Sequence, residues 1–540
     1  MNHPAWEHYP SQIKKDIEIP DWSLPEMLNE TVHRFGAQDA ISFYGVKTTY
    51  LRLQQAVAAF GSSLQQRGVV KGDRVAVMLP NCPHYVIAYY GVLAAGGIVT
   101  QINPMSVERE MEYLLQDSGA TTIVVLDALY ARVKSIQGRT ALRHVIVVSL
   151  QTGNQNTGET NFAPDQTFEK FLTEGNARSF TPVQVDPAND VAILQYTGGT
   201  TGLPKGAMLT HRNLVANVVQ SAEFFKQDLV PGTERCLAVL PLFHVFGMTS
   251  CMNLGLYLGS TLIMLPRFHP AEVLETIERE HVTTFPGVPT MYIALNQHIL
   301  EAGNKATSLK MCNCGGAPMP VELLRQFEQK MGAQILEGYG LSETSPVTHC
   351  NPSFAKRKPG SIGLPFPSTE FKIVDIETGT REVAVGEPGE MIVRGPQVMK
   401  GYWNMPEETT RALRDGWFYT GDIATMDEDG YAYIVDRKKD LIIANGYNIY
   451  PREIEEVLYG HPDVLEAVVV GVADDYRGET VHAYIVPKPE STLTIEELAQ
   501  YCKKNLAAYK VPKHFELRNE LPKSAVGKIV RRMLREEKQA

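Results

Sequence analysis

The chain of 540 residues is poor in cysteine and has no excess of basic residues, and each shortage excludes a class of protein. Its seven cysteines are odd in number and scattered, with only Cys312 and Cys314 close together. They build neither a disulfide framework nor paired zinc ligands. The net charge of −10 argues against general nucleic-acid binding. We therefore expect a protein of the reducing cytoplasm with no nucleic-acid partner.

Long hydrophobic runs are also scarce. The N-terminus lacks the basic start and the apolar run of a secretory signal. The longest uncharged run extends from Met248 to Pro266, close to the roughly 20 apolar residues that a membrane span needs. Gly255, Gly259 and Ser260 interrupt this run, and its tail is typical of a buried strand. We expect a buried helix and strand here rather than a membrane span.

Strand-like and helix-like segments alternate along the chain, which is longer than one hydrophobic core usually serves. The pattern predicts a strand from Asp73 to Leu79 and a following helix from Tyr85 to Ala95. The alternation predicts parallel sheets covered by helices, with a loop over about residues 152–182. A Gly- and Pro-rich segment over about residues 355–437 predicts antiparallel β-structure. An α/β pattern returns over residues 438–540, with helices predicted from Pro451 to Leu458 and from Ile495 to Asn505. The sequence thus predicts an α/β protein of at least two domains.

The stretch YTGGTTGLPKG, which begins at Tyr196, has almost no large side chains. Glycines let backbone N–H groups approach a ligand, threonine hydroxyls add donors, and Lys205 adds a positive charge, so a triphosphate is the expected ligand. The spacing differs from a Walker A loop because Lys205 lies between Pro204 and Gly206. A flexible surface turn is the alternative. We favour a phosphate loop because a strand-like segment precedes the stretch and helix-like residues follow it.

Two further clusters fit a nucleotide. In EGYGLSETSP, Tyr339 is suited to stack on a purine and Glu343 to bind the Mg²⁺ that accompanies ATP. The alternative is a helix cap that follows a strand. In GWFYTGD, the carboxylate of Asp422 can accept two ribose hydroxyls, although an aspartate of an ordinary turn has the same signature.

The order of these motifs resembles the adenylate-forming family of acyl-CoA synthetases, luciferases and peptide-synthetase adenylation domains. The resemblance covers essentially the whole chain and extends to PLFHVFG, GGAPMP, DRKKDLIIANGYNIYPREIE and PKSAVGKI. Within the family, the chain looks most like the bacterial long-chain fatty-acyl-CoA synthetases. The resemblance implies a large N-terminal domain, residues 1–437, of doubly wound mixed sheets with a small β-barrel-like subdomain. A small, mobile α+β domain would follow over residues 438–540.

The resemblance implies two half-reactions. A fatty carboxylate and ATP give acyl-AMP and pyrophosphate, and the thiol of coenzyme A then displaces AMP. A fatty carboxylate is already ionised near pH 7, so the first step needs charge neutralisation rather than a protein base. The resemblance gives this role to Lys528, places Thr344 beside the α-phosphate, and places the hinge between the domains at Lys439.

The same resemblance assigns the other contacts residue by residue. The phosphate contacts are Thr197, Gly198, Gly199, Thr200, Thr201, Gly202 and Lys205. The adenine slot is Gly315, Gly316, Ala317, Glu337, Gly338, Tyr339 and Gly340. The ribose is assigned to Asp422 and Arg437, Mg²⁺ to Thr197 and Glu343, and coenzyme A to Gly446 and Tyr447. The wall of the acyl pocket is His244, Val245, Phe246, Gly247 and Met248.

Several alternatives stay open on the sequence alone. A medium-chain or aryl-CoA ligase and a luciferase-like oxygenase share every ATP motif. A peptide-synthetase module and a non-catalytic nucleotide-binding regulator are further rivals. Acyl chain length, a homodimer and a peripheral contact between the basic region Lys503 to Arg535 and a membrane are left undecided.

Overall fold

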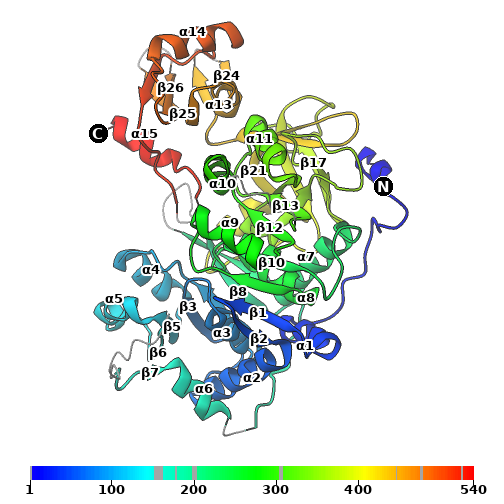
Figure 1. The fold of residues 1–540 in the computed structure, drawn as a ribbon, viewed down its shortest axis with the longest axis vertical. Helices are drawn as coiled ribbons and strands as arrows, with labels where there is room; N and C mark the ends of the chain where they lie inside the picture. The colour runs from blue at the N-terminus through cyan, green and yellow to red at the C-terminus, as the bar shows by residue number, and fades with distance from the viewer. Residues whose placement is uncertain are drawn as a thin grey trace.

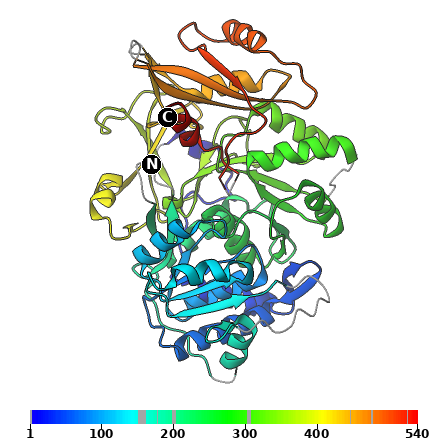
Figure 2. The ribbon, with the colours of Figure 1, turned by 90° about the vertical axis from the view of Figure 1, so that its left-hand side faces the viewer.

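The computed structural model describes residues 3–150, 162–176, 179–197, 204–302, 308–444, 447–474, 478–524 and 527–539. Within these ranges, the strands form four sheets. Figure 1 and Figure 2 show the first six α-helices at one end of the molecule and the C-terminal α13 (Pro451–Tyr459) and α14 (Ile495–Asn505) at the other.

The largest sheet has nine strands within the described residues, in the order β16-β15-β14-β13-β12-β10-β11-β1-β2. Its strands β10 to β14 run parallel, and each is short and buried. In the order of the sheet, the strands are Leu364–Pro365, Val347–Cys350, Ile335–Gly340, Met311–Cys314, Thr284–Gly287, Arg235–Ala238, Thr261–Met264, Asp39–Phe43 and Val46–Thr49.

The second sheet has eight described strands, in the order β19-β9-β8-β4-β3-β5-β6-β7. Its β3 (Arg74–Met78), with the helix α3 (Pro83–Ala94) that follows, corresponds to the strand and helix predicted near residues 73–95. Every side chain of β4 and nearly all of α3 are buried, as expected for the centre of a parallel sheet covered by helices. In the order of the sheet, the strands are Gly401–Tyr402, Lys205–Thr210, Val191–Thr197, Ile98–Gln101, Arg74–Met78, Thr122–Leu126, His144–Val148 and Gln166–Thr167.

The predicted β-rich segment forms a five-stranded antiparallel sheet among the residues described. Its strands are β17 (Glu370–Val374), β18 (Gly389–Arg394), β20 (Leu413–Arg414), β21 (Trp417–Met426) and β22 (Ala432–Arg437). The N-terminal segment crosses the molecule to this sheet, where the His3 ring lies 4.7 Å from that of Phe371.

The remaining sheet, also five-stranded in the described part of the chain, uses only residues after Leu441 and has its own apolar core. Helices α13 and α14 match the helices predicted near residues 451–458 and 495–505. The strands are β23 (Ile442–Ala444), β24 (Tyr447–Ile449), β25 (Val464–Asp474), β26 (Gly478–Pro487) and β27 (His514–Leu517). The predicted α/β architecture, with a large N-terminal mixed-sheet domain and a smaller C-terminal one, is thus confirmed.

Helices cover these sheets and often begin with a side-chain cap. Ser23 and Glu26, for example, form a capping box at the start of α1. Besides α13 and α14, the helices of the described residues are η1 Pro4–His8, α1 Leu24–Phe35, α2 Tyr50–Gln66, α3 Pro83–Ala94, α4 Glu108–Ser118, α5 Asp127–Gln137, α6 Phe168–Asn176, α7 His211–Phe224, η2 Gly247–Asn253, α8 Leu254–Tyr257, α9 Pro270–Arg279, α10 Pro289–Ala302, α11 Val321–Met331, η3 Ser342–Thr344, α12 Pro406–Ala412 and α15 Arg531–Gln539.

Two local predictions were wrong. The residues directly after the phosphate loop, Lys205–Thr210, form β9 and not the start of a helix, because they pair antiparallel with β8; the helix α7 begins only at His211. Within the predicted loop of residues 152–182, Phe168–Asn176 forms α6, because Phe168 and Phe171 on one helix face are buried against α2.

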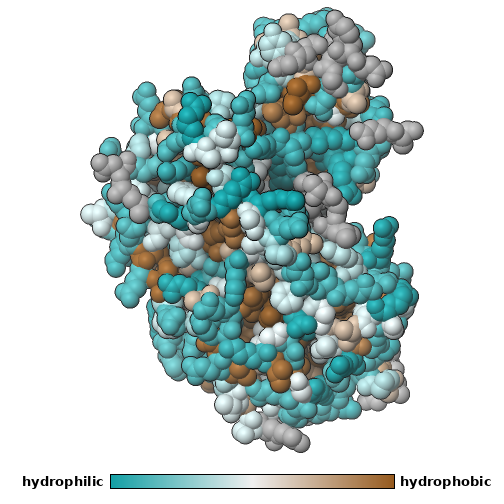
Figure 3. Space-filling model, turned by 180° about the vertical axis from the view of Figure 1, so that it is seen from behind, coloured by the Kyte–Doolittle hydropathy of each residue, from teal (hydrophilic) through white to brown (hydrophobic). Residues whose placement is uncertain are grey.

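The uncharged run from Met248 to Pro266 is buried, as predicted, as η2, α8 and β11. In the ranges that the structure describes, every helix is too short or too polar to cross a membrane. Figure 3 shows one face of the molecule, on which hydrophilic residues predominate and hydrophobic residues lie among them.

Candidate active site

Lys528 reaches from the C-terminal part of the chain into the N-terminal sheets. It lines a cavity of about 10 Å³ together with residues of three N-terminal segments: Leu240, Pro241, His244, Phe246, Gly247, Val288 and Gly316. A Cβ atom added at Gly316, where φ is +82°, would lie only 3.1 Å from Lys528 Cε. A side chain at residue 316 would therefore shift the end of Lys528 by a few tenths of an ångström.

The charge of Lys528 is set by its surroundings. Burial, and to a smaller extent the nearby Arg437, lower its pKa to about 8, against the opposing effect of Asp422 and Glu343. The ammonium group is thus still mostly protonated at pH 7, in a site where a negative charge would stabilise it.

The loop that carries His244 forms the opposite wall of this cavity. The backbone N–H of Phe246 donates to His244 Nδ1 at 3.3 Å, which leaves the proton on Nε2. Burial lowers the pKa of His244 to about 3, with the charge of Lys528 acting in the same direction. His244 is therefore a neutral hydrogen-bond donor rather than a base at pH 7.

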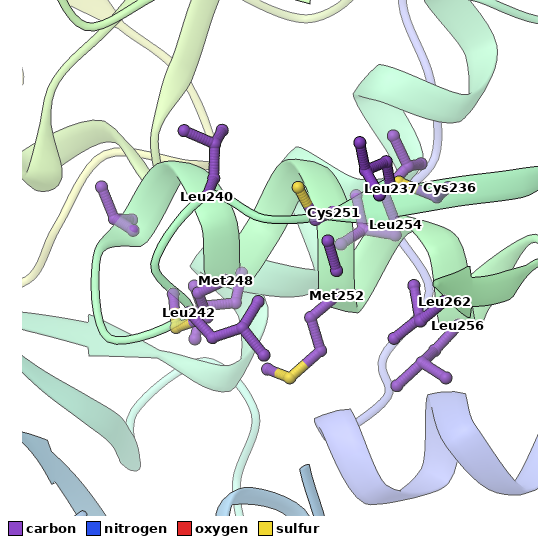
Figure 4. Packing of buried hydrophobic residues seen from close by; sticks show 14 of the residues in the cluster. Cys236, Leu237, Leu240, Leu242, Met248, Cys251, Met252, Leu254, Leu256 and Leu262 are labelled. Atoms are coloured by element: carbon purple, nitrogen blue, oxygen red, sulfur yellow. The ribbon is translucent and has the colours of Figure 1, made fainter. Parts of the chain in front are cut away.

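The acyl-pocket residues predicted from the sequence divide into two groups. His244, Phe246 and Gly247 line the cavity, whereas Val245 and Met248 are fully buried in the core. Figure 4 shows Met248 packed with apolar side chains of η2 and of the preceding loop, among them Leu242 and Met252. The sulfur of Met248 lies 3.2 Å from Nε2 of Gln101.

Asp422 and Arg437 are cross-strand partners on β21 and β22. Oδ1 of Asp422 lies 3.6 Å from Arg437 Nε, and its Oδ2 accepts a 2.5 Å hydrogen bond from the hydroxyl of Tyr339. Asp422 is 6% exposed, and burial raises the pKa of its carboxyl group. The structure thus brings the predicted ribose pair together with one residue of the predicted adenine slot.

The slot itself lies where β13 ends and along the second half of β14, because Cys314 at the end of β13 pairs in parallel with Glu337 on β14. A Cβ atom at Gly315 would lie 3.3 Å from the ring of Phe246, so the absence of a side chain there keeps the slot next to the His244 loop. Of the other predicted slot residues, Ala317 lies in the connection after β13, and Gly338 and Gly340 lie in the second half of β14.

Glu337 is nearly buried, and its Oε2 accepts a 2.9 Å hydrogen bond from the backbone N–H of Gly360. Burial raises the pKa of Glu337 to about 7. Thr344 is fully buried and its hydroxyl bonds to Leu341 and Pro346 within the turn. Both side chains are therefore held by backbone groups of their own neighbourhood.

The two ends of the phosphate loop lie side by side, because Thr197 on β8 pairs with Lys205 on β9. Lys205 forms an ion pair with Glu408 of α12, and its ammonium lies 5.3 Å from the ring centroid of Tyr402. The hydroxyl of Tyr402 donates to Glu343 Oε1 at 2.8 Å. Burial raises the pKa of Glu343, which belongs to η3, a turn packed against β8 and β9.

The remaining predicted residues lie at the surface or outside the described residues. Lys439 follows β22 and is exposed, and Tyr447 is 55% exposed with its ring stacked 4.7 Å from that of Tyr509. The predicted contacts outside the described residues are Gly198, Gly199, Thr200, Thr201, Gly202 and Gly446.

Five contributors to the site were missed by sequence reasoning. Tyr402 and Glu408 contact predicted residues, but they lie in no motif that we used. Three buried amides hold the His244 loop through its backbone: Asn81 bonds to Ala238, Leu240 and Leu242, Gln101 to Leu242, and Gln195 to Phe243. No local signal marks them, because each acts on a segment far away in the chain.

Comparison with known proteins identifies the family of the chain. Residues 28–403 match the family described as AMP-binding enzyme, and residues 453–528 match the AMP-binding enzyme C-terminal domain. The chain belongs to the AMP-binding, adenylate-forming enzyme family.

Its relatives include a long-chain-fatty-acid–CoA ligase of Bacillus subtilis, 46% identical over 99% of this chain and 98% of the relative. An Escherichia coli O157:H7 protein of the same name is 41% identical over 98% of this chain and 97% of its own length. Among solved structures, an anthranilate CoA ligase in complex with anthranoyl-AMP superposes with a TM-score of 0.87. It is 26% identical and is matched over 96% of this chain and 98% of its own.

Proposed function

We propose that this chain is a ligase that joins a long-chain fatty acid to coenzyme A at the expense of ATP. The reaction passes through an acyl-adenylate and releases AMP and pyrophosphate. The observation that carries the proposal is the position of Lys528 in the cavity between Gly316 and the His244 loop, next to Asp422 and Arg437. Relatives of 41% to 46% identity over nearly the full chain carry the long-chain-fatty-acid–CoA ligase name.

In adenylation, Lys528 neutralises charge where the fatty carboxylate meets the α-phosphate. The carboxylate is ionised near pH 7 and is the nucleophile, so its attack needs no base. Two anions must approach each other, and a preorganised ammonium group in a dry site lowers that barrier. The neutral His244, with its proton on Nε2, adds a donor to the same cavity.

The nucleotide sites follow from the same residues. Asp422 and Arg437 bind the ribose hydroxyls, and the connection after β13 and the second half of β14 enclose the adenine. Lys205 and Thr197, at the two ends of the loop, hold the β- and γ-phosphates. This loop binds the leaving pyrophosphate, and Thr344 lies beside the α-phosphate.

Mg²⁺ is part of this proposal because ATP carries it and the donors suit it. Glu343 offers a carboxylate on η3, which packs against the strand that ends at Thr197. Oxygen ligands with only one or two carboxylates are typical of protein-bound Mg²⁺. Burial disfavours the charged form of Glu343, so a bound cation would stabilise its carboxylate. The cation would neutralise phosphate charge there.

The hinge between the proposed domains, residues 1–437 and 438–540, is at Lys439. Lys438 is still bound to the N-terminal part, through its backbone N–H to Gly421 O and through its ammonium to Glu390, both at 2.9 Å. Asp440 is already paired with Arg535 of α15, at 3.0 Å. Lys439 lies between these two anchors and is exposed, so a backbone rotation there needs little rearrangement of its own side chain.

The acyl chain is proposed to run from the cavity past η2. The cavity of about 10 Å³ is too small for an alkyl chain, so buried side chains must move to admit one. Met248 and Met252 are flexible and lie along this path, and η2 is a π-helix, a form found often at functional sites.

Coenzyme A is proposed to approach near the exposed Tyr447. A homodimer and a peripheral membrane contact through residues 503–535 are further proposals. Sedimentation with anionic vesicles at low salt tests the membrane contact, and no binding there would exclude it.

The decisive experiment measures AMP release across fatty acids of increasing chain length and for coumarate, with and without coenzyme A. We expect release that depends on long-chain acids and thioester only when coenzyme A is present. Preference for coumarate would favour an aryl-CoA ligase. Saturable ATP binding without acid-dependent AMP release would identify a nucleotide-binding regulator instead.

A further inference from the structure

Helix α13 of the C-terminal part is held by strand β22, which precedes the hinge. The side chain of Asp436 on β22 is 3% exposed, and its Oδ2 accepts a 3.0 Å hydrogen bond from the backbone N–H of Arg452. The N-cap residue of α13, Tyr450, makes no side-chain cap of its own. Asp436 therefore supplies the carboxylate that stabilises the N-terminus of a helix on the other side of Lys439.

The side chain of Arg452 makes a second bond across the hinge. Its Nη1 donates to the backbone oxygen of Ile434 on β22, and the side chain is 13% exposed. Its contact with Glu456, one turn along α13, is long, at 3.9 Å. The main hydrogen bond of Arg452 is thus made to the N-terminal part of the chain rather than to its own helix.

Helix α13 is in turn tied to the loop of Lys528. Glu455, three residues after Arg452, binds Arg531 through both of its carboxylate oxygens, each at 2.7 Å. Arg531 begins α15, only three residues after Lys528. A chain of short bonds therefore runs from β22 through α13 to the lysine in the cavity.

We infer that Arg452 is a positioning residue for adenylation, which holds α13 against β22 and thereby keeps Lys528 in the cavity. This inference rests on the proposed function, in which the C-terminal domain rotates about Lys439 between the half-reactions. Rotation breaks the bonds of Arg452 to β22 but leaves the Glu455–Arg531 pair, which lies entirely beyond the hinge, intact. Arg452 therefore acts in the first half-reaction and not in the second.

The test compares Arg452→Ala with Arg518→Ala in the full chain, with the two half-reactions assayed separately. Arg518 is a matched control because it forms ion pairs with Glu516 and Glu537, both beyond the hinge. For Arg452→Ala we expect kcat of acyl-AMP formation to fall about tenfold, the factor for one charge-assisted hydrogen bond. KM for ATP and the conversion of supplied acyl-AMP and coenzyme A to thioester should stay within about twofold of wild type.

Arg518→Ala should leave both half-reactions within about twofold. Asp436→Ala, which removes the cap and leaves Arg452 in place, should reproduce the selective loss of adenylation, and Arg452→Lys should restore part of it. Equal losses in both half-reactions, or no loss in either, would overturn the role of Arg452. A wild-type protein that forms no acyl-AMP at all would instead overturn the proposed function.

Discussion

At the scale of single residues, the ammonium group of Lys528 has the most demanding environment in the site. It lies next to Arg437, which lowers its pKa, and depends on Asp422 and Glu343 to oppose that effect. The charged ammonium group is stabilised most when two further anions, a carboxylate and a phosphate, bind beside it. This position serves the adenylation half-reaction. Without substrate, the charged form of Lys528 is disfavoured by burial and Arg437 and is stabilised by Asp422 and Glu343.

Lys528→Ala should abolish acyl-AMP formation and leave the second half-reaction in place. Removal of one preorganised donor commonly costs about 2.7 to 4 kcal/mol, or roughly 10²- to 10³-fold in rate. Pyrophosphate release without coenzyme A measures the first step, and thioester formation from supplied acyl-AMP measures the second. If both steps fell equally, the alternation of domains about Lys439 would be wrong.

The pH dependence of adenylation should report the lowered pKa of Lys528. Because the pKa is about 8 and the protonated form is the active one, kcat/KM for acyl-AMP formation should fall as pH rises through about 8. Lys528→Arg should lack this alkaline fall, since a guanidinium group stays charged. A wild-type profile that is flat from pH 7 to 9 would contradict the assignment.

At the scale of elements, the connection after β13 is shaped for Lys528 by the glycine at residue 316. Gly316→Ala would add a Cβ atom 3.1 Å from Lys528 Cε at a φ of +82°. Gly332→Ala, at the end of α11, is the matched control because φ there is +70° but no atom lies within 4 Å. Both variants should lose about 1 kcal/mol of stability from backbone strain.

Only Gly316→Ala should also slow acyl-AMP formation, by about tenfold, because only there does the new methyl group displace Lys528. Thermal unfolding and pyrophosphate release measure the two effects separately. Equal activity in the two variants would show that Lys528 does not need the space at residue 316.

The loop that carries His244 depends on Asn81, which is 2% exposed and makes three hydrogen bonds to its backbone at 2.8 to 3.0 Å. Asn81→Ala should lower the free energy of unfolding by about 2 to 3 kcal/mol, because it leaves buried backbone groups unpaired. It should also raise KM for the fatty acid. Asn505→Ala, which removes one exposed bond, should change stability by about 0.5 kcal/mol or less in urea unfolding.

At the scale of the whole molecule, all seven cysteines are buried and unpaired. Burial raises the thiol pKa of Cys82 to about 12, as expected for an apolar environment. The folded protein should therefore react slowly with Ellman's reagent, and unfolding in guanidinium should expose all seven thiols. Rapid reaction of several thiols in the folded protein would show that the core opens easily.

Local patterns in the sequence predicted the architecture well, because buried strands and covering helices have short periodicities. The helix predicted over residues 495–505 coincides with α14, and the strand and helix near residues 73–95 are β3 and α3. The strand β9 was missed because its antiparallel pairing with β8 on one side and β19 on the other decides its structure, and not the preferences of its own residues.

The residues of the candidate site could be predicted only where they belong to a sequence motif. Lys528 was expected from a resemblance and Asp422 also from its own motif; the structure places Lys528 in the cavity and the carboxylate of Asp422 near enough to raise the pKa of Lys528. The ion pair between Lys205 and Glu408 joins residues 203 positions apart, and no local sequence pattern predicts such a partner. The same holds for the bond from Tyr402 to Glu343.

The pairing of β19 with β9 has a consequence for synthesis of the chain. Gly401 and Tyr402 cover the outer side of β9, next to the phosphate loop, and they come almost two hundred residues later in the chain. Until the ribosome has made them, β9 presents unpaired backbone groups that can join a strand of another molecule. A nascent or truncated chain that ends before Gly401 should therefore aggregate through this edge and depend on chaperones to reach the native state.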